Sequence, residues 1–230
     1  MIKIVLFGYS KTGREIAKLL HPDEYELNII DENPLHVAQA NEDGFFARHS
    51  TFNDDKLLNE MGIGEDAKIL FCTSSNDSLN LFVTLSARNI DKNLKILTLI
   101  YKKEDEKKML LAGANRTISP YDVGALKAFR IIDKPQVSKV LNLFSSHTNK
   151  LAISEIKIVK DSILNGVYFN DTNIFREFDL IFLGILDREL GEEFIFCSQG
   201  LNHKIDDEDV IVVLGSKMNI QNFKQKVGSK

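Results

Sequence analysis

The sequence predicts an α/β protein in three consecutive parts: a doubly wound parallel sheet, a helix-turn-helix crossover and a small, mostly antiparallel α+β domain. Three observations support this prediction. Strand-like and helix-like patterns alternate through the first half of the chain, which is typical of βαβ units. Two short apolar-faced helical patterns then follow outside this alternation, and period-two strand patterns begin at Leu151. We place the three domains at residues 1–120, 121–149 and 150–230.

The first domain is expected to contain a parallel sheet, because helical crossovers are what join parallel strands. Apolar and β-branched runs predict strands at 2–7, 26–31, 44–48, 67–73, 94–101 and 116–118. Helical periodicity predicts the crossovers at 12–20, 34–42, 54–61, 77–89 and 104–112. Nearly continuous apolar strands such as Ile4–Phe7 indicate that helices cover both faces of the sheet.

A glycine-rich turn follows the first strand. Its residues, Gly8-Tyr9-Ser10-Lys11-Thr12-Gly13, lead into a helix, and Asp31 ends the second strand. This order is that of the Rossmann-like dinucleotide-binding motif, in which an acidic residue follows about 20 positions on. Ser10 replaces the middle glycine, which normally lets the backbone approach a pyrophosphate. The motif therefore predicts a Rossmann-like fold more firmly than it predicts a bound nucleotide.

If a nucleotide binds, the phosphates are expected at this turn. The backbone amides of Ser10–Gly13 and the helix dipole favour an anion there, and Lys11 and Arg14 add positive charge. Alternatively, both side chains are solvated first-turn residues. Asp31 is placed to accept hydrogen bonds from ribose hydroxyls, or else to cap the turn that follows it.

Polar residues also follow the fourth strand, where open α/β sheets bind ligands. They bind a ligand, cap the helix that begins at Asp77, or do both. The full set of candidate ligand-binding residues is Gly8, Tyr9, Ser10, Lys11, Thr12, Gly13, Arg14, Asp31, Glu32, His49, Thr73, Ser74 and Asn76.

The crossover region is predicted to form two short helices, Tyr121–Ile132 and Gln136–Phe144, separated at Pro135. Their apolar stripe either packs on the first domain or is buried by another subunit. The stripe contains Leu126, Phe129, Val140 and Phe144. Beyond it, strands are predicted at 153–159, 179–186, 193–197 and 210–214, with a closing helix at 220–227.

Composition limits the function classes. A net charge of −4 and a pI near 5.8 give no electrostatic reason to expect nucleic acid as a partner. The scattered histidines form no catalytic motif, so no catalytic residue is assigned. Cys72 and Cys197 lie in apolar runs without metal-ligand spacing, and both are expected to be buried, reduced thiols. No uncharged apolar run approaches the roughly 18 residues that span a bilayer.

Several of these segments together resemble a known family. The glycine turn, Ile30-Asp31, the Thr73–Asp77 segment and Ala112-Gly113-Ala114-Asn115-Arg116-Thr117-Ile118-Ser119-Pro120 are similar to the RCK domain, the regulator of conductance of potassium, also called the Trk/Ktr nucleotide-binding domain. The later segments Asp161–Val167 and Asp206–Gly215 resemble its C-terminal TrkA-C module. The resemblance covers essentially the whole chain.

The resemblance implies a cytosolic gating-ring domain that couples ligand binding to the conductance of a potassium channel. It implies homodimers joined through about 121–144, assembly into an octameric ring, and association with the membrane through a channel pore or transporter subunit. Met1 lies almost on the first strand, where the cytosolic domain of a channel would begin. The implied ligand is an adenine nucleotide: ATP, ADP or NAD/NADH.

Two features depart from the family's pattern. His49-Ser50 stands where the family often has Gly-Asp, and Leu99 and Tyr101 stand where calcium-sensing members carry carboxylates. We therefore expect no metal site in that cleft. Two alternative functions stay open, a free nucleotide-binding subunit of a Trk/Ktr potassium transporter and an NAD(P)-dependent oxidoreductase.

Overall fold

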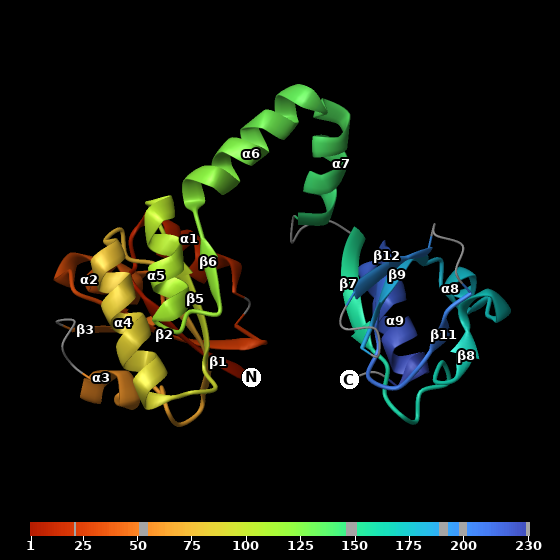
Figure 1. Ribbon diagram of the computed structural model, residues 1–230, viewed down its shortest axis with the longest axis horizontal. Helices are drawn as coiled ribbons and strands as arrows, with labels where there is room; N and C mark the ends of the chain where they lie inside the picture. The colour runs from red at the N-terminus through yellow and green to blue at the C-terminus, as the bar shows by residue number, and fades with distance from the viewer. Residues whose placement is uncertain (21, 51–54, 146–150, 189–192, 198–201, 229–230) are drawn as a thin grey trace. The chain divides into compact units, whose positions relative to one another are not determined.

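The protein is described by a computed structural model that covers residues 1–230 except 21, 51–54, 146–150, 189–192, 198–201 and 229–230 (Figure 1). The chain divides into two compact units, Met1–Phe129 and Arg130–Lys230. Each unit has its own sheet and its own core, and each is treated by itself below. The domain boundaries predicted near residues 120 and 149 remain a prediction.

The first unit is built on a six-stranded sheet in the order β3-β2-β1-β4-β5-β6, with every neighbouring pair parallel. The predicted doubly wound sheet is confirmed. The order reverses at β1, which lies between β2 and β4. The strands are β1 (Ile2–Phe7), β2 (Tyr25–Asp31), β3 (Phe46–His49), β4 (Ala67–Cys72), β5 (Lys95–Leu99) and β6 (Arg116–Ile118).

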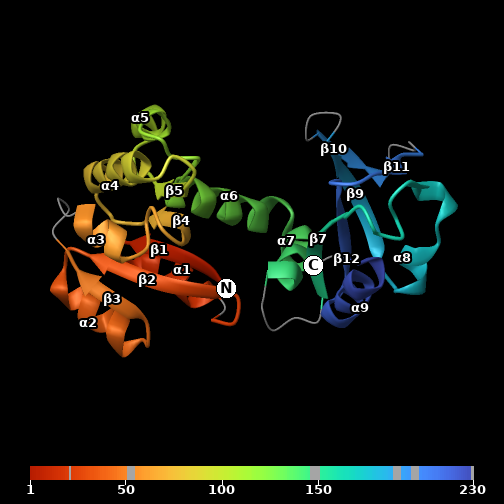
Figure 2. The same cartoon turned by 90° about the horizontal axis from the view of Figure 1, so that it is seen from below.

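Helices cover both faces of this sheet, as the apolar strands predicted. Figure 2 shows α1 and α2 on one side and α4 and α5 on the other. Alternate residues along β1 supply the two cores: Leu6 packs with Ala17 and Ala40, while Val5 packs with Leu57 and Val83. The helices are α1 (Lys11–Leu19), α2 (Pro34–Glu42), α3 (Asp55–Glu60), α4 (Asp77–Ile90), the 3-10 turn Lys103–Asp105 and α5 (Glu106–Leu111).

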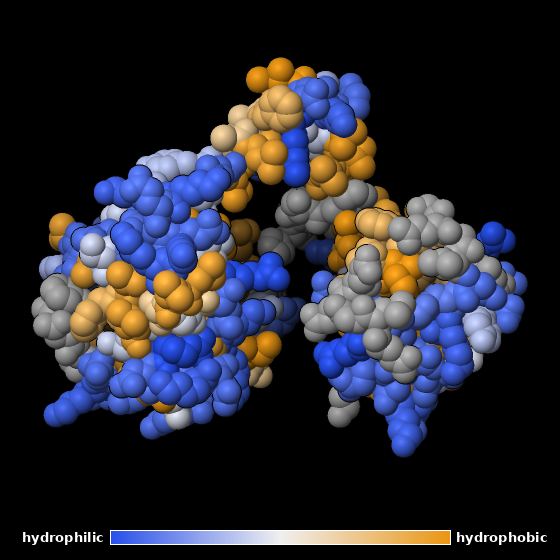
Figure 3. All heavy atoms as spheres, viewed as in Figure 1, coloured by the Kyte–Doolittle hydropathy of each residue, from blue (hydrophilic) through white to orange (hydrophobic). Residues whose placement is uncertain are grey.

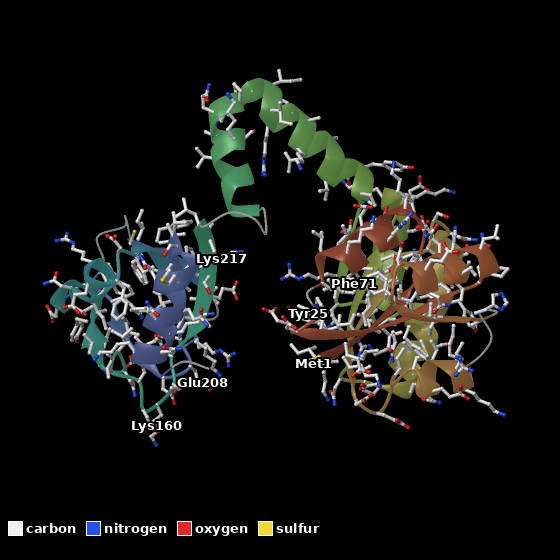
Figure 4. The ribbon with its side chains drawn as sticks, turned by 180° about the vertical axis from the view of Figure 1, so that it is seen from behind. Met1, Tyr25, Phe71, Lys160, Glu208 and Lys217 are labelled. Carbon is white, nitrogen blue, oxygen red and sulfur yellow. The ribbon has the colours of Figure 1, made fainter. Side chains whose placement is uncertain are left out.

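The two ends of the sheet differ in what they carry. Met1 and Tyr25, labelled in Figure 4, lie where β1 and β2 begin, and Phe71 lies near the carboxyl end of β4. The glycine turn follows β1 at the carboxyl end, so it stands at the point where the strand order reverses. In open α/β sheets, ligands bind in the crevice at the carboxyl ends of the strands where the strand order reverses.

The predicted crossover helices are present as α6 (Pro120–Asp133) and α7 (Pro135–Ser145). No residue of α6 is buried, and orange spheres mark apolar residues at the surface of α6 and of α7 (Figure 3). Leu126, Phe129 and Val140 are exposed. The part of the stripe that lies in the first unit, Leu126 and Phe129, is therefore not packed on the first domain. Burial of the stripe by another subunit stays a prediction, and the side chain of Phe144 lies outside the described residues.

The second unit contains a four-stranded antiparallel sheet in the order β10-β9-β12-β7, with α9 packed against it. Its core gathers aromatic rings, with Phe175 next to Phe182 and Phe223. The predicted strands and closing helix are confirmed as β7 (Leu151–Lys157), β9 (Ile181–Asp187), β10 (Glu193–Phe196), β12 (Val210–Ser216) and α9 (Lys217–Val227).

Some features of this unit have no signal in the sequence. The short pair β8 (Val167–Tyr168) and β11 (Lys204–Ile205), the 3-10 turn Phe169–Asp171 and the helix α8 (Ile174–Glu177) are too short to show a hydrophobic period. The expectation that both cysteines are buried is half wrong. Cys72 is buried, but Cys197 is exposed just beyond the edge strand β10.

Candidate functional site

The turn after β1 needs both of its glycines. Gly8 has a φ of +99°, a conformation that L side chains rarely adopt, and a Cβ there would overlap the backbone of Ser74. A Cβ on Gly13 would overlap the carbonyl oxygen of Gly8. The turn, the first turn of α1 and the end of β4 are thus in direct backbone contact.

Thr73 and Ser10 tie the glycine turn to the end of β4. The Thr73 hydroxyl lies 2.5 Å from the Gly8 carbonyl oxygen and 3.1 Å from that of Phe7. In return, the Ser10 hydroxyl donates to the Thr73 carbonyl over 3.1 Å. Ser10, which breaks the glycine motif, therefore has a structural role of its own. Its side chain holds the turn closed against β4.

Asp31 ends β2 beside this turn, and its carboxylate is almost entirely buried. Oδ2 accepts hydrogen bonds from the Tyr9 backbone amide at 2.5 Å and contacts Nδ1 of His36 at 3.1 Å. Oδ1 accepts from the Asn33 amide at 2.7 Å. Asp31 does cap the turn that follows it, as one of the two sequence interpretations held. It also braces the glycine turn from the other side.

Arg14 does not face the turn as a free cation. Its Nη2 donates to Asp43 Oδ1 over 2.9 Å, and the Tyr9 hydroxyl donates to Asp43 Oδ2 over 2.7 Å. Hydrogen bonds from Tyr9 and Arg14 hold the pKa of Asp43 below its usual range, while burial and the Asp43 carboxylate raise the pKa of Tyr9. Lys11, by contrast, is exposed at the start of α1. Lys11 is thus the better placed of the two expected cations to meet a phosphate.

The polar residues after β4 cap the next helix, as expected. The Asn76 side chain accepts from the Ser78 amide at 2.9 Å, and the Asn76 amide donates to the Ser74 hydroxyl over 3.2 Å. Asn80 is fully buried in α4, and its side-chain amide bonds both backbone groups of Ser74. These contacts fix the loop that faces the glycine turn.

Tyr101 connects the glycine turn to α6. Its backbone amide donates to the Asp77 carboxylate at 3.1 Å, which anchors the end of β5 to the start of α4. Burial raises the pKa of Tyr101, and a side-chain hydrogen bond with Thr12 opposes that rise. On its other side the ring packs edge-on against Tyr121, with centroids 5.7 Å apart. The first turns of α1 and α6 thus contact one side chain.

The remaining predicted residues lie beside this centre. Glu32 is exposed, and its carbonyl oxygen lies 2.9 Å from Nε2 of the exposed His49. An open hollow of about 500 Å³ lies along the outer side of the turn. It is lined by Tyr9, Ser10, Lys11, Arg14, Glu15, Leu35, His36 and Gln39.

The sequence patterns did not predict His36 and Asp43 as parts of this region, and they placed Tyr101 in the cleft only as a position without a carboxylate. A histidine in the first turn of the helix after Asp31 was the one available signal, since such spacing brings it back toward the strand end. Among the described residues, no group of three or more histidine, cysteine or acidic side chains is arranged to hold a metal.

This sheet order, with a glycine turn and an acidic strand end at its switch point, defines a Rossmann-like domain of the nucleotide-binding class. The TrkA-N domain model matches residues 4–120, and the chain belongs to that family. The predicted relationship to RCK and Trk/Ktr proteins is confirmed.

Named relatives come from potassium transport. The chain is 26% identical to "Probable potassium channel protein 2" of Methanocaldococcus jannaschii, over 98% of this chain and 67% of that protein. It is 24% identical to "Ktr system potassium uptake protein C" of Bacillus subtilis, over 98% of this chain and 97% of that protein. The chain thus spans about two thirds of the channel relative.

Solved structures confirm the fold. The RCK domain of GsuK superposes on 99% of this chain and 46% of that one, with a TM-score of 0.50 and 18% identity. The match to the GsuK channel bound to NAD covers 99% of this chain and 39% of the GsuK chain, with a TM-score of 0.51 and 16% identity. Among the described residues, no helix is both long and apolar enough to cross a bilayer.

Proposed function

We propose that this chain is the cytosolic regulatory part of a potassium channel and couples the binding of an adenine nucleotide to potassium conductance. The observation that carries the proposal is the glycine turn at the switch point of the sheet, braced by Asp31 and Thr73, in a chain whose relatives are named for potassium transport. The chain has no assigned catalytic residue in this proposal, and its role is regulatory.

The nucleotide is proposed to lie across the carboxyl ends of β1, β2 and β4. Amides at the start of α1 and the exposed Lys11 favour its phosphates. Asp31 lies at the strand end where this fold binds a ribose. The GsuK channel, which has the same fold, has been solved bound to NAD, and this makes NAD a suitable first probe.

Two features support a regulatory role for this site. The exposed apolar stripe of α6 and α7 fits burial by a second copy of the chain, which we propose as the dimer from which a ring is assembled. Tyr101 contacts both Thr12 at the glycine turn and Tyr121 on α6. Through Tyr101, a ligand that moves the glycine turn would also move α6, the helix proposed to form the dimer.

A free regulatory subunit of a Ktr-type uptake system is the second candidate. The match to the Bacillus subtilis uptake protein favours it, because that match covers nearly the whole of both chains. The two candidates share the fold and the site, and they differ in whether the pore is covalently attached.

Calorimetric titration with ATP, ADP, NAD and NADH tests the proposal. We expect at least one to bind and Asp31→Ala to weaken it by about tenfold or more, because hydrogen bonds to a charged group are worth about 1.5–3 kcal/mol. Asp91→Ala is the matched control, since Asp91 also accepts from an amide two residues on, that of Asn93, at 2.7 Å. Failure of all four nucleotides to bind would refute the nucleotide site. Turnover of NADH with a substrate would favour an oxidoreductase.

A further inference from the structure

We propose that His36 competes with the nucleotide ribose for Asp31, and thereby sets both the affinity of the site and its dependence on pH. The proposal rests on the proposed function, because it takes a ribose at Asp31 as given. The contact behind it is the 3.1 Å approach of His36 Nδ1 to Asp31 Oδ2. Neither the glycine motif nor the comparisons assign a role to His36.

The hydrogen-bonding capacity of Asp31 is nearly used up. A carboxylate offers about four lone-pair sites. Three are engaged, by the amides of Tyr9 and Asn33 and by the ring of His36. The side chain of Asp31 is only 6% exposed, so there is little room for additional partners. A ribose that brings two hydroxyls therefore has to displace one existing partner.

His36 is the partner that can leave. The Tyr9 amide belongs to a buried turn and the Asn33 amide belongs to the N-cap of α2, so moving either one would distort the backbone. The His36 side chain is 40% exposed and lines the hollow beside the turn. It can rotate away from Asp31 without any change in the fold.

Charge makes this competition depend on pH. Imidazole changes its charge between about pH 5 and 8, and a protonated ring binds a carboxylate more strongly than a neutral one. Around the same hollow, α1 presents Lys11, Arg14 and Glu15, and Glu32 follows Asp31 in the chain. Arg14 is already paired with Asp43. Glu15 is paired with Lys18, and Asp31 is the carboxylate that contacts the His36 ring. Acid should therefore strengthen the contact between His36 and Asp31 and weaken nucleotide binding.

Titration calorimetry with NAD at pH 6 and pH 8 tests the proposal, because the NAD diphosphate does not change charge in this range. We expect His36→Ala to bind NAD about three- to tenfold more tightly than the parent chain at pH 6, with a smaller difference at pH 8. His36→Gln, which cannot be protonated, should lose the pH dependence. His203→Ala should behave like the parent chain, since His203 belongs to the second unit and its ring lies near Asp187 and Asp209.

The outcomes separate this inference from the proposed function. If the parent chain binds NAD and His36→Ala binds equally or more weakly at both pH values, the competition is refuted while the nucleotide site stands. If His36→Ala binds NAD and the parent chain does not, the competition is supported, because His36 then blocks the site completely. If neither binds NAD or any of the other three nucleotides, both proposals fall.

Discussion

The glycine turn and the part of helix α6 up to Phe129 belong to one compact unit but present opposite surfaces. At the turn, backbone and side-chain groups are paired: Tyr9, Ser10 and Thr73 each bond a neighbouring element. On α6, large apolar side chains meet solvent, and none of its residues is buried. The difference teaches that the turn is ordered by contacts within the chain, whereas the described part of the chain buries no residue of α6.

The largest effect should come from filling the turn. Gly13→Ala should destabilise the first unit by about 3 kcal/mol, because the added methyl overlaps the Gly8 carbonyl and overpacking costs about 1–3 kcal/mol even where side chains can shift. Urea denaturation measures the loss.

Gly124→Ala on α6 is the matched control. Nothing lies within 4 Å of a Cβ at Gly124. A glycine in a helix costs roughly 0.5–1 kcal/mol relative to alanine, so this change should stabilise the chain slightly. Equal losses in the two variants would contradict the contrast between the packed turn and the open helix.

An intermediate effect is expected on assembly. Phe129 is 61% exposed, so Phe129→Asp should leave the fold intact while adding a charge to the apolar stripe. We expect the dimer to dissociate at micromolar concentrations, as measured by sedimentation, and Lys127→Asp on the same helix to leave it associated. A parent chain that is monomeric at these concentrations would show that the stripe has another partner or none.

The smallest effect concerns Asp43, which accepts hydrogen bonds from Tyr9 and Arg14 beside the turn. The pKa of Asp43 is lowered in the folded state, so its contribution is present above the unfolded pKa, about 3.9, and is lost as the pH falls through the folded value. Asp43→Asn should therefore be less stable than the parent at pH 6, with the difference shrinking below about pH 4. Denaturation curves between pH 3 and 6 measure it. A difference that does not change with pH would mean that the pairing contributes no net stability.

Local sequence signals explain most of the fold. Gly113 illustrates this: it ends α5 with a φ of +108°, as glycine does after a helix, within the Ala112–Pro120 segment that resembles the RCK family. A Cβ at Gly113 would overlap the side chain of Arg88, so the glycine also leaves room for Arg88, whose Nε donates to the Gly113 carbonyl over 3.1 Å. The helix end at Gly113 can be predicted from the sequence. The contact with Arg88 cannot, because Arg88 lies 25 residues away in the chain.

The sequence by itself determined the alternation of strands and helices, the glycine turn, the position of Asp31 and the apolar stripe of α6. Each is a pattern within a few residues, set by backbone conformation or by hydrophobic period. Only the tertiary structure decided that Arg14 pairs with Asp43, that the His36 ring contacts Asp31 and that Cys197 is exposed. These outcomes depend on how α1 and α2 pack beside each other and on which strand lies at a sheet edge. Such contacts join residues that local periodicity does not relate.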